Sequence, residues 1–183
     1  MTKQEIIDAA MQIALAGNDA HASPVIDSEM TAEDLLPHAF RHAYKILLNS
    51  GEMRLQEVLR SHTITLSSET APYNNMSGPL PEGVLTEYLE HAFLPDFPYS
   101  SYLPFVADYT RHKYEPILCY WTVNNSTFYT SCGEDPATIE LHAPSIPVIP
   151  DDPATDISMP AAAENSVIMV LARAIRGDLK LLT

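Results

Sequence analysis

The placement of proline constrains this sequence most. Thirteen of its fifteen prolines lie between Pro72 and Pro160, in a chain of 183 residues. Proline has a fixed φ and no N–H to donate, so it interrupts helices and is confined to the edges of sheets. The middle of the chain therefore cannot be mostly helical.

Helical patterns occur near the two ends of the sequence. Thr2 and Glu5 have the spacing of a capping box, and the apolar residues that follow predict a helix over residues 3–16. A second helix is predicted over residues 31–51, where apolar residues recur on one broad face. Pro37 predicts a kink or a restart within it.

The last predicted helix covers residues 160–176. Pro160 suits a first helical turn and Gly177 suits the position just after a helix. The short tail that follows, residues 178–183, is apolar in LKLLT and either frays or docks on another surface.

Strand patterns fill the region between these helices. Residues 55–67 predict a strand, because alternation with β-branched residues is clear in HTITL. Residues 138–142 and 146–149 predict two further strands that prolines confine to edges. The segment EYLEHAF, residues 87–93, fits either a short helix or an irregular edge.

The clearest strand pair is a hairpin built from residues 117–123 and 126–132. Asn124 and Asn125 separate the two runs, and Asn tolerates the positive φ of a type I′ turn. That register places Trp121 opposite Phe128 and Cys119 opposite Thr130, on a face that we expect to belong to the core. Two aromatic residues on the opposite face are candidates for a subunit contact: Tyr120 and Tyr129.

The length and composition predict one globular domain, the helix and strand patterns give it the α+β class, and the charge disfavours direct binding to nucleic acid. Ten Lys and Arg stand against 24 Asp and Glu, which gives a formal charge of −14 that repels phosphates. The N-terminus lacks the pattern of a secretory signal, and no stretch is apolar enough to span a membrane. The only two cysteines are expected to be reduced thiols of a cytoplasmic product.

Motifs for catalysis or nucleotide binding are missing from the sequence. GxxxxGK, GxGxxG, GxSxG and HExxH do not occur, and six glycines leave little material for a phosphate-binding loop. Asp34, His38 and His42 have the spacing of a divalent metal site, but a partly exposed polar face explains them as well. We expect no catalytic residue, no cofactor and no bound metal.

The order of the elements and three segments carry a resemblance to a known family. The segments are LPEGVL at residues 80–85, YWTVNNSTFYTS at 120–131, and IPDDPATDIS at 149–158, which precedes the last helix. This layout resembles the head-to-tail connector, or adaptor, proteins of tailed bacteriophages, also called head-completion proteins.

The resemblance implies a single connector-like domain and a structural role in the virion. Its helical bundle would use residues 1–51 and 158–177, with a Pro-rich antiparallel β insertion over residues 55–150. Such proteins form a ring, commonly of twelve copies, between the portal and the tail or neck. DNA passes through the ring without specific binding. The tail residues are candidate portal contacts: Leu179, Lys180, Leu181 and Leu182.

Other interpretations of the sequence stay open. Another neck protein or a tail terminator would share the acidity and the ring. A small cytoplasmic enzyme or metal-binding protein would use Asp34, His38 and His42. A binding module would take a peptide or a small ligand at the aromatic hairpin.

Overall fold

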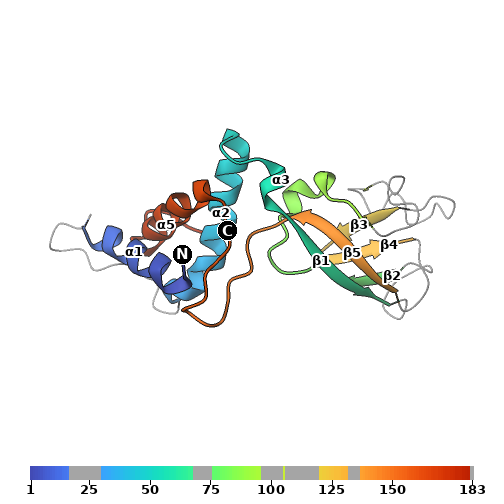
Figure 1. The fold of residues 1–183 in the computed structure, drawn as a ribbon, viewed down its shortest axis with the longest axis horizontal. Coiled ribbons are helices and arrows are strands. Elements are labelled where there is room, and N and C mark those ends of the chain that lie inside the picture. Colours follow the sequence, from blue (N-terminus) through green and yellow to red (C-terminus); the bar gives the residue numbers. More distant parts are fainter. Residues whose placement is uncertain (17–29, 68–75, 96–104, 106–119, 132–136, 182–183) are drawn as a thin grey trace. The chain divides into compact units, whose positions relative to one another are not determined.

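The computed structural model describes residues 1–16, 30–67, 76–95, 105, 120–131 and 137–181. Within them the chain is mixed helix and antiparallel strand, which confirms the α+β class with helices near both ends. The chain divides into two compact units (Figure 1). The helical unit comprises residues 1–58 and 146–183, and the β unit comprises residues 59–145.

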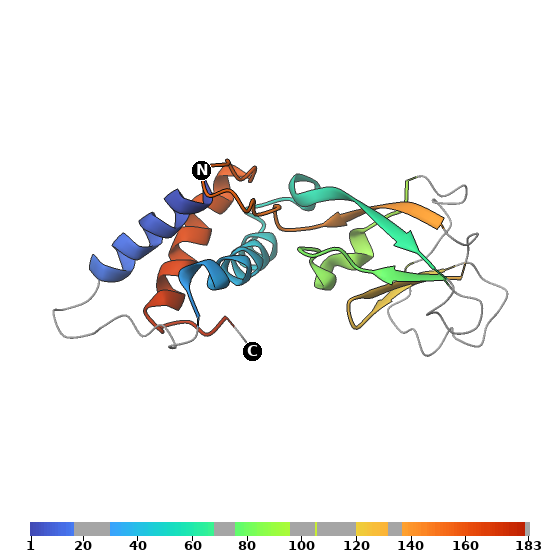
Figure 2. The same cartoon turned by 90° about the horizontal axis from the view of Figure 1, so that it is seen from below.

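The longest helices of the helical unit are α1 (Lys3–Ala16), α2 (Ala32–Ser50) and α5 (Ala161–Ile175). α5 packs against both α1 and α2, which contact each other little, so α5 lies between them (Figure 2). Their apolar stripes meet in a core that includes Ile6, Ala10, Leu36, Phe40, Tyr44, Val167 and Leu171. No helix in the described part of the chain is both long enough and apolar enough to cross a membrane.

Caps fix the starts of α1 and α2 as the sequence predicts. The Thr2 N–H donates to Glu5 Oε2 at 2.8 Å, and the Glu5 N–H donates to Thr2 Oγ1 at 3.2 Å. Thr31 and Asp34 form the same reciprocal box at α2. α2 continues through Pro37 as one helix, so of the predicted kink or restart the restart does not occur. Proline removes only one helical N–H, and the buried face of α2 offsets that loss.

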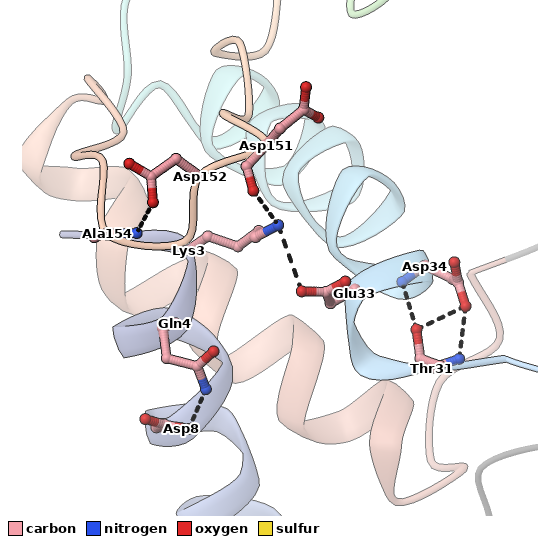
Figure 3. Close-up of polar contacts among 9 residues, drawn as sticks. All are labelled: Lys3, Gln4, Asp8, Thr31, Glu33, Asp34, Asp151, Asp152 and Ala154. Atoms are coloured by element: carbon pink, nitrogen blue, oxygen red, sulfur yellow. Dashed lines mark hydrogen bonds and ion pairs between the residues drawn. The ribbon is translucent and has the colours of Figure 1, made fainter.

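Lys3 links three segments of the helical unit (Figure 3). Its Nζ lies 3.4 Å from Glu33 Oε1 at the start of α2 and donates to the Asp151 carbonyl at 3.2 Å. Asp152 accepts from the Ala154 N–H at 3.0 Å, which fixes the turn beside it. The acidic loop that precedes α5 is therefore held by local hydrogen bonds and one lysine.

The β unit contains two antiparallel sheets. β1 (Leu59–Leu66) pairs with β5 (Ala137–Pro144), and β4 (Thr127–Thr130) lies between β2 (Met76–Pro79) and β3 (Trp121–Asn124). Ser67 and Ser77 exchange backbone hydrogen bonds of 2.9 and 3.0 Å, which joins the end of β1 to β2. The core between these strands includes Ile64, Leu66, Met76, Leu89, Trp121, Phe128, Ile139 and Leu141.

Two predicted strand segments differ from the structure. Residues 55–58, predicted as strand, form the short helix α3 (Leu55–Val58), whose start is fixed by a 2.8 Å bond from the Arg54 N–H to Glu57 Oε2. Residues 146–149 form no strand. Pro147 has no N–H for a ladder, and pairing ends at the isolated bridge between Ser145 and Val84.

The hairpin exists, but its predicted register is wrong by two residues. The turn residues with positive φ are Asn125 (47°) and Ser126 (60°), so Asn124 stays in β3 and pairs with Thr127. Trp121 consequently pairs with Thr130. Trp121 and Phe128 still share one face, where their rings stack with centroids 5.5 Å apart. Cys119 and Cys132 lie outside the described residues.

Candidate functional site

A groove of about 540 Å³ lies in the β unit between the hairpin tip and the 3-10 helix η1 (Thr86–His91). The segment EYLEHAF contains both of the predicted alternatives, since η1 ends at His91 and Phe93 then forms an isolated bridge with His142 of β5. The groove is lined by Thr86, Glu87, Leu89, Glu90, Phe105, Val123, Asn125 and Ser126. It is therefore built from three segments that are far apart in the sequence.

Stacked aromatic rings support the floor of this groove. The Phe105 ring lies 4.7 Å from the buried Trp121 ring, which in turn stacks on Phe128. Phe105 and Trp121 also form an isolated parallel bridge, so backbone and side chain fix Phe105 together. Leu89 beside it is 3% exposed. The floor is therefore apolar, which suits it to receive an apolar side chain.

The rim of the groove is polar and acidic. Glu87 and Glu90 are exposed on η1, three residues apart, and Glu90 Oε1 lies 3.2 Å from His91 Nε2, while Asn125 and Ser126 are exposed at the hairpin tip. The Leu80 N–H donates to the Ser126 carbonyl at 2.9 Å and so anchors that tip. An acidic rim over an apolar floor favours a ligand that carries a positive charge beside an apolar group.

A histidine and a serine meet at one end of the β1–β5 pair. His62 Nε2 lies 2.8 Å from Ser145 Oγ, and that hydroxyl donates to the Ala143 carbonyl at 3.0 Å. Because the serine proton is used there, His62 donates its Nε2–H to Ser145. A serine nucleophile needs the opposite polarity, and Ser145 is fully buried. The pair is therefore a structural contact.

The electrostatics of His62 agree with that assignment. Burial lowers the pKa of His62 below its ordinary value, and the positive charges of Arg60 and His142 lower it further. The neutral imidazole that results is the form that can donate one N–H to Ser145. On the opposite face of the pair, the Glu140 carboxylate lies 2.6 Å from His142 Nε2 and also accepts from Ser61.

The structure separates the candidate interface residues. Tyr120 is only 3% exposed and its N–H donates to Ser131 Oγ, so it has little surface for a partner. Tyr129 is half-buried. After α5, Lys180 is exposed and the leucines on either side of it are half-buried: Leu179 and Leu181. Leu182 lies outside the described residues.

The alternative metal site gains no support. The Asp34 carboxylate accepts from the Thr31 N–H at 2.8 Å and from Thr31 Oγ1 at 2.7 Å, and these bonds lower the pKa of Asp34. Asp34 thus belongs to the capping box of α2, in which Thr31 is the N-cap. Across the ranges that the structure describes, no group of three His, Cys, Asp or Glu side chains is arranged to hold a metal ion.

Comparisons with known proteins leave the family open. No protein-family model matches this chain, and no curated protein is significantly similar to it. The functional argument therefore rests on the residues and their geometry.

Sequence reasoning missed the groove. Glu87, Glu90 and Phe105 belong to a region whose secondary structure the sequence leaves open, and no motif marks them. The one usable signal was the i,i+3 spacing of the two glutamates, which places them on the same side of a short helix. Phe105 reaches the groove only through its contact with Trp121.

Proposed function

We propose that this chain is a structural subunit of a ring between the portal and the tail or neck of a tailed bacteriophage. The observation that carries the proposal is the two-unit organisation. Helices from both ends of the sequence share one unit, and the intervening residues 59–145 form a β unit. The connector resemblance implies this order of a helical bundle with a Pro-rich β insertion.

A ring of identical subunits needs two different complementary surfaces on every chain. Two distinct units in one subunit offer separate places for these surfaces. Assembly in the host cytoplasm and residence in the virion follow from the same role, with the portal and a tail or neck protein as partners.

The charge distribution also supports a DNA channel. Acidic side chains are exposed in both units, among them Glu5, Asp8, Glu33, Glu52, Glu57, Glu82, Glu87, Glu90, Asp151, Asp152, Asp156 and Asp178. Carboxylates repel phosphates, so DNA can slide past such a surface without being held. The proposal assigns the chain no catalytic step.

Imaging with portal particles tests this function. The purified protein is mixed with portal particles from the same source and examined by negative-stain electron microscopy. A ring of added density on one end of the portal is the expected result. Protein that stays dispersed as monomers and leaves the portal unchanged would contradict the proposal. A tail terminator in place of a connector would form a ring but leave portals bare.

A further inference from the structure

The groove beside η1 has the chemistry of a receptor for a short peptide segment. Its apolar floor, Leu89, Phe105 and Val123, is large enough for aliphatic side chains. Its exposed carboxylates, Glu87 and Glu90, stand on one side of that floor. A segment that binds there should point aliphatic side chains toward the floor and an ammonium or guanidinium group toward the carboxylates of η1.

The chain contains one segment with this pattern. Lys180 is the only one of the ten Lys and Arg residues that has a leucine on each side. In the structure Lys180 is exposed, and no helix or strand includes it. Leu179 lies in a bend and both leucines are half-buried in their own chain, so docking would release them and extend the segment, which points Leu179 and Leu181 to the same side. The long stem of Lys180 lets its ammonium group turn toward the rim.

We propose that Leu179, Lys180 and Leu181 of one copy dock in the η1 groove of a second copy. The inference rests on the proposed function, since it supplies the ring with a contact between unlike surfaces. Each chain carries both this groove and this segment, so the contact repeats from copy to copy until the ring closes. Pairing a lysine with the acidic rim also offsets the repulsion between subunits whose formal charge is −14.

Photo-cross-linking between labelled copies tests the contact directly. Benzoylphenylalanine replaces Leu181 in the full chain, and equal amounts of ¹⁵N-labelled and unlabelled protein are mixed, irradiated and digested. We expect cross-links from residue 181 to residues 86–90 or 123–126 that join one heavy and one light peptide. Cross-links only within heavy or within light chains would overturn docking on a second copy. The absence of cross-links to the groove would overturn the inference altogether.

Charge reversal gives a second test that needs no bulky group. Glu90→Lys and Lys180→Glu should each weaken self-association roughly fivefold, as expected when a partly exposed ion pair becomes a repulsion. The double variant should recover most of the loss. Glu52→Lys is the matched control, because it makes the same charge change at an exposed site of the helical unit. If Glu90→Lys and Lys180→Glu behave like this control in sedimentation equilibrium, the docking proposal is wrong.

The two tests also separate this inference from the connector proposal. A ring in micrographs without heavy–light cross-links would overturn the docking contact and leave the ring. Heavy–light cross-links in a protein that forms no ring would support the contact and contradict the connector.

Discussion

Replacing Gly78 with alanine tests the close crossing of β1 and β2. A Cβ at Gly78 would lie 2.4 Å from the Thr65 carbonyl oxygen, 3.0 Å from Ile64 Cγ2 and 3.2 Å from Leu66 Cδ2. Side chains can yield at the two longer distances. The carbonyl oxygen cannot yield alone, because Thr65 is paired with Thr138 in the β1–β5 ladder.

The expected loss in the free energy of unfolding depends on whether the added Cβ meets backbone or side-chain atoms. Added methyl groups in a packed site cost about 1–3 kcal/mol, and a backbone obstacle places Gly78→Ala at the upper end, about 3 kcal/mol. Gly51→Ala is the matched control. Gly51 has φ 77°, and a Cβ added there would have no atom within 4 Å, so its substitution costs only the left-handed conformation, about 1 kcal/mol.

Fluorescence of the single tryptophan measures the effect on the β unit. Trp121 is 2% exposed and stacked on Phe128, so its emission reports the loss of packing around it during guanidinium unfolding. Circular dichroism at 222 nm follows the helices in the same samples. Gly78→Ala should lower the tryptophan midpoint well below that of Gly51→Ala. Equal midpoints, or a cost under about 1 kcal/mol for Gly78→Ala, would refute the close-contact argument.

Three further predictions concern caps and buried polar groups. Thr31→Ala should cost about 1 kcal/mol by circular dichroism, because it removes the cap of α2. The lowered pKa of Asp34 means that this cap stabilises the fold above the ordinary carboxyl pKa of 3.8 and is lost as the pH falls through the lower folded value. The pKa of His62 is also lowered, so the unfolded chain takes up the proton first. The free energy of unfolding should therefore fall as the pH drops below about 6.5, and His62→Gln should remove that part of the slope in tryptophan-detected urea titrations. Ser145→Ala leaves the His62 N–H without this acceptor and should cost about 1–3 kcal/mol in the same assay, whereas Ser61→Ala on the exposed face should cost much less.

The sequence predicted correctly those elements that depend on interactions between residues close together in the chain. The Thr2–Glu5 cap, the alternation in HTITL and the apolar stripe of α5 each act within a few residues. These interactions give the same structure in most contexts, so pattern and observation agree.

The hairpin register could not be predicted because three polar residues compete for two turn positions. Asn124, Asn125 and Ser126 all lie between the strand patterns, and asparagine is the better residue for positive φ. The structure places Ser126 in the turn, where its carbonyl accepts from Leu80. That bond comes from a distant segment, and it accompanies the shift that pairs Trp121 with Thr130.

The groove lay beyond prediction for the same reason. Its floor depends on Phe105 reaching Trp121, and its rim depends on η1, in which Tyr88 departs from helical geometry with φ −117° and ψ 19°. Neither feature follows from a local pattern. The candidate tyrosines were chosen for their face of the hairpin, whereas burial of Tyr120 depends on what covers that face.

The mass of the assembled protein tests the connector account most directly. Light scattering after size exclusion is measured over a tenfold range of loading concentration. A closed ring of twelve copies of the 20.2 kDa chain predicts one species of constant mass, about 240 kDa, for the protein alone, or a gain of about 240 kDa in the mass of added portal particles. A mass of 20.2 kDa under every condition, with portals present, would contradict the account. So would a mass that keeps rising with concentration, since an open chain of subunits does not close.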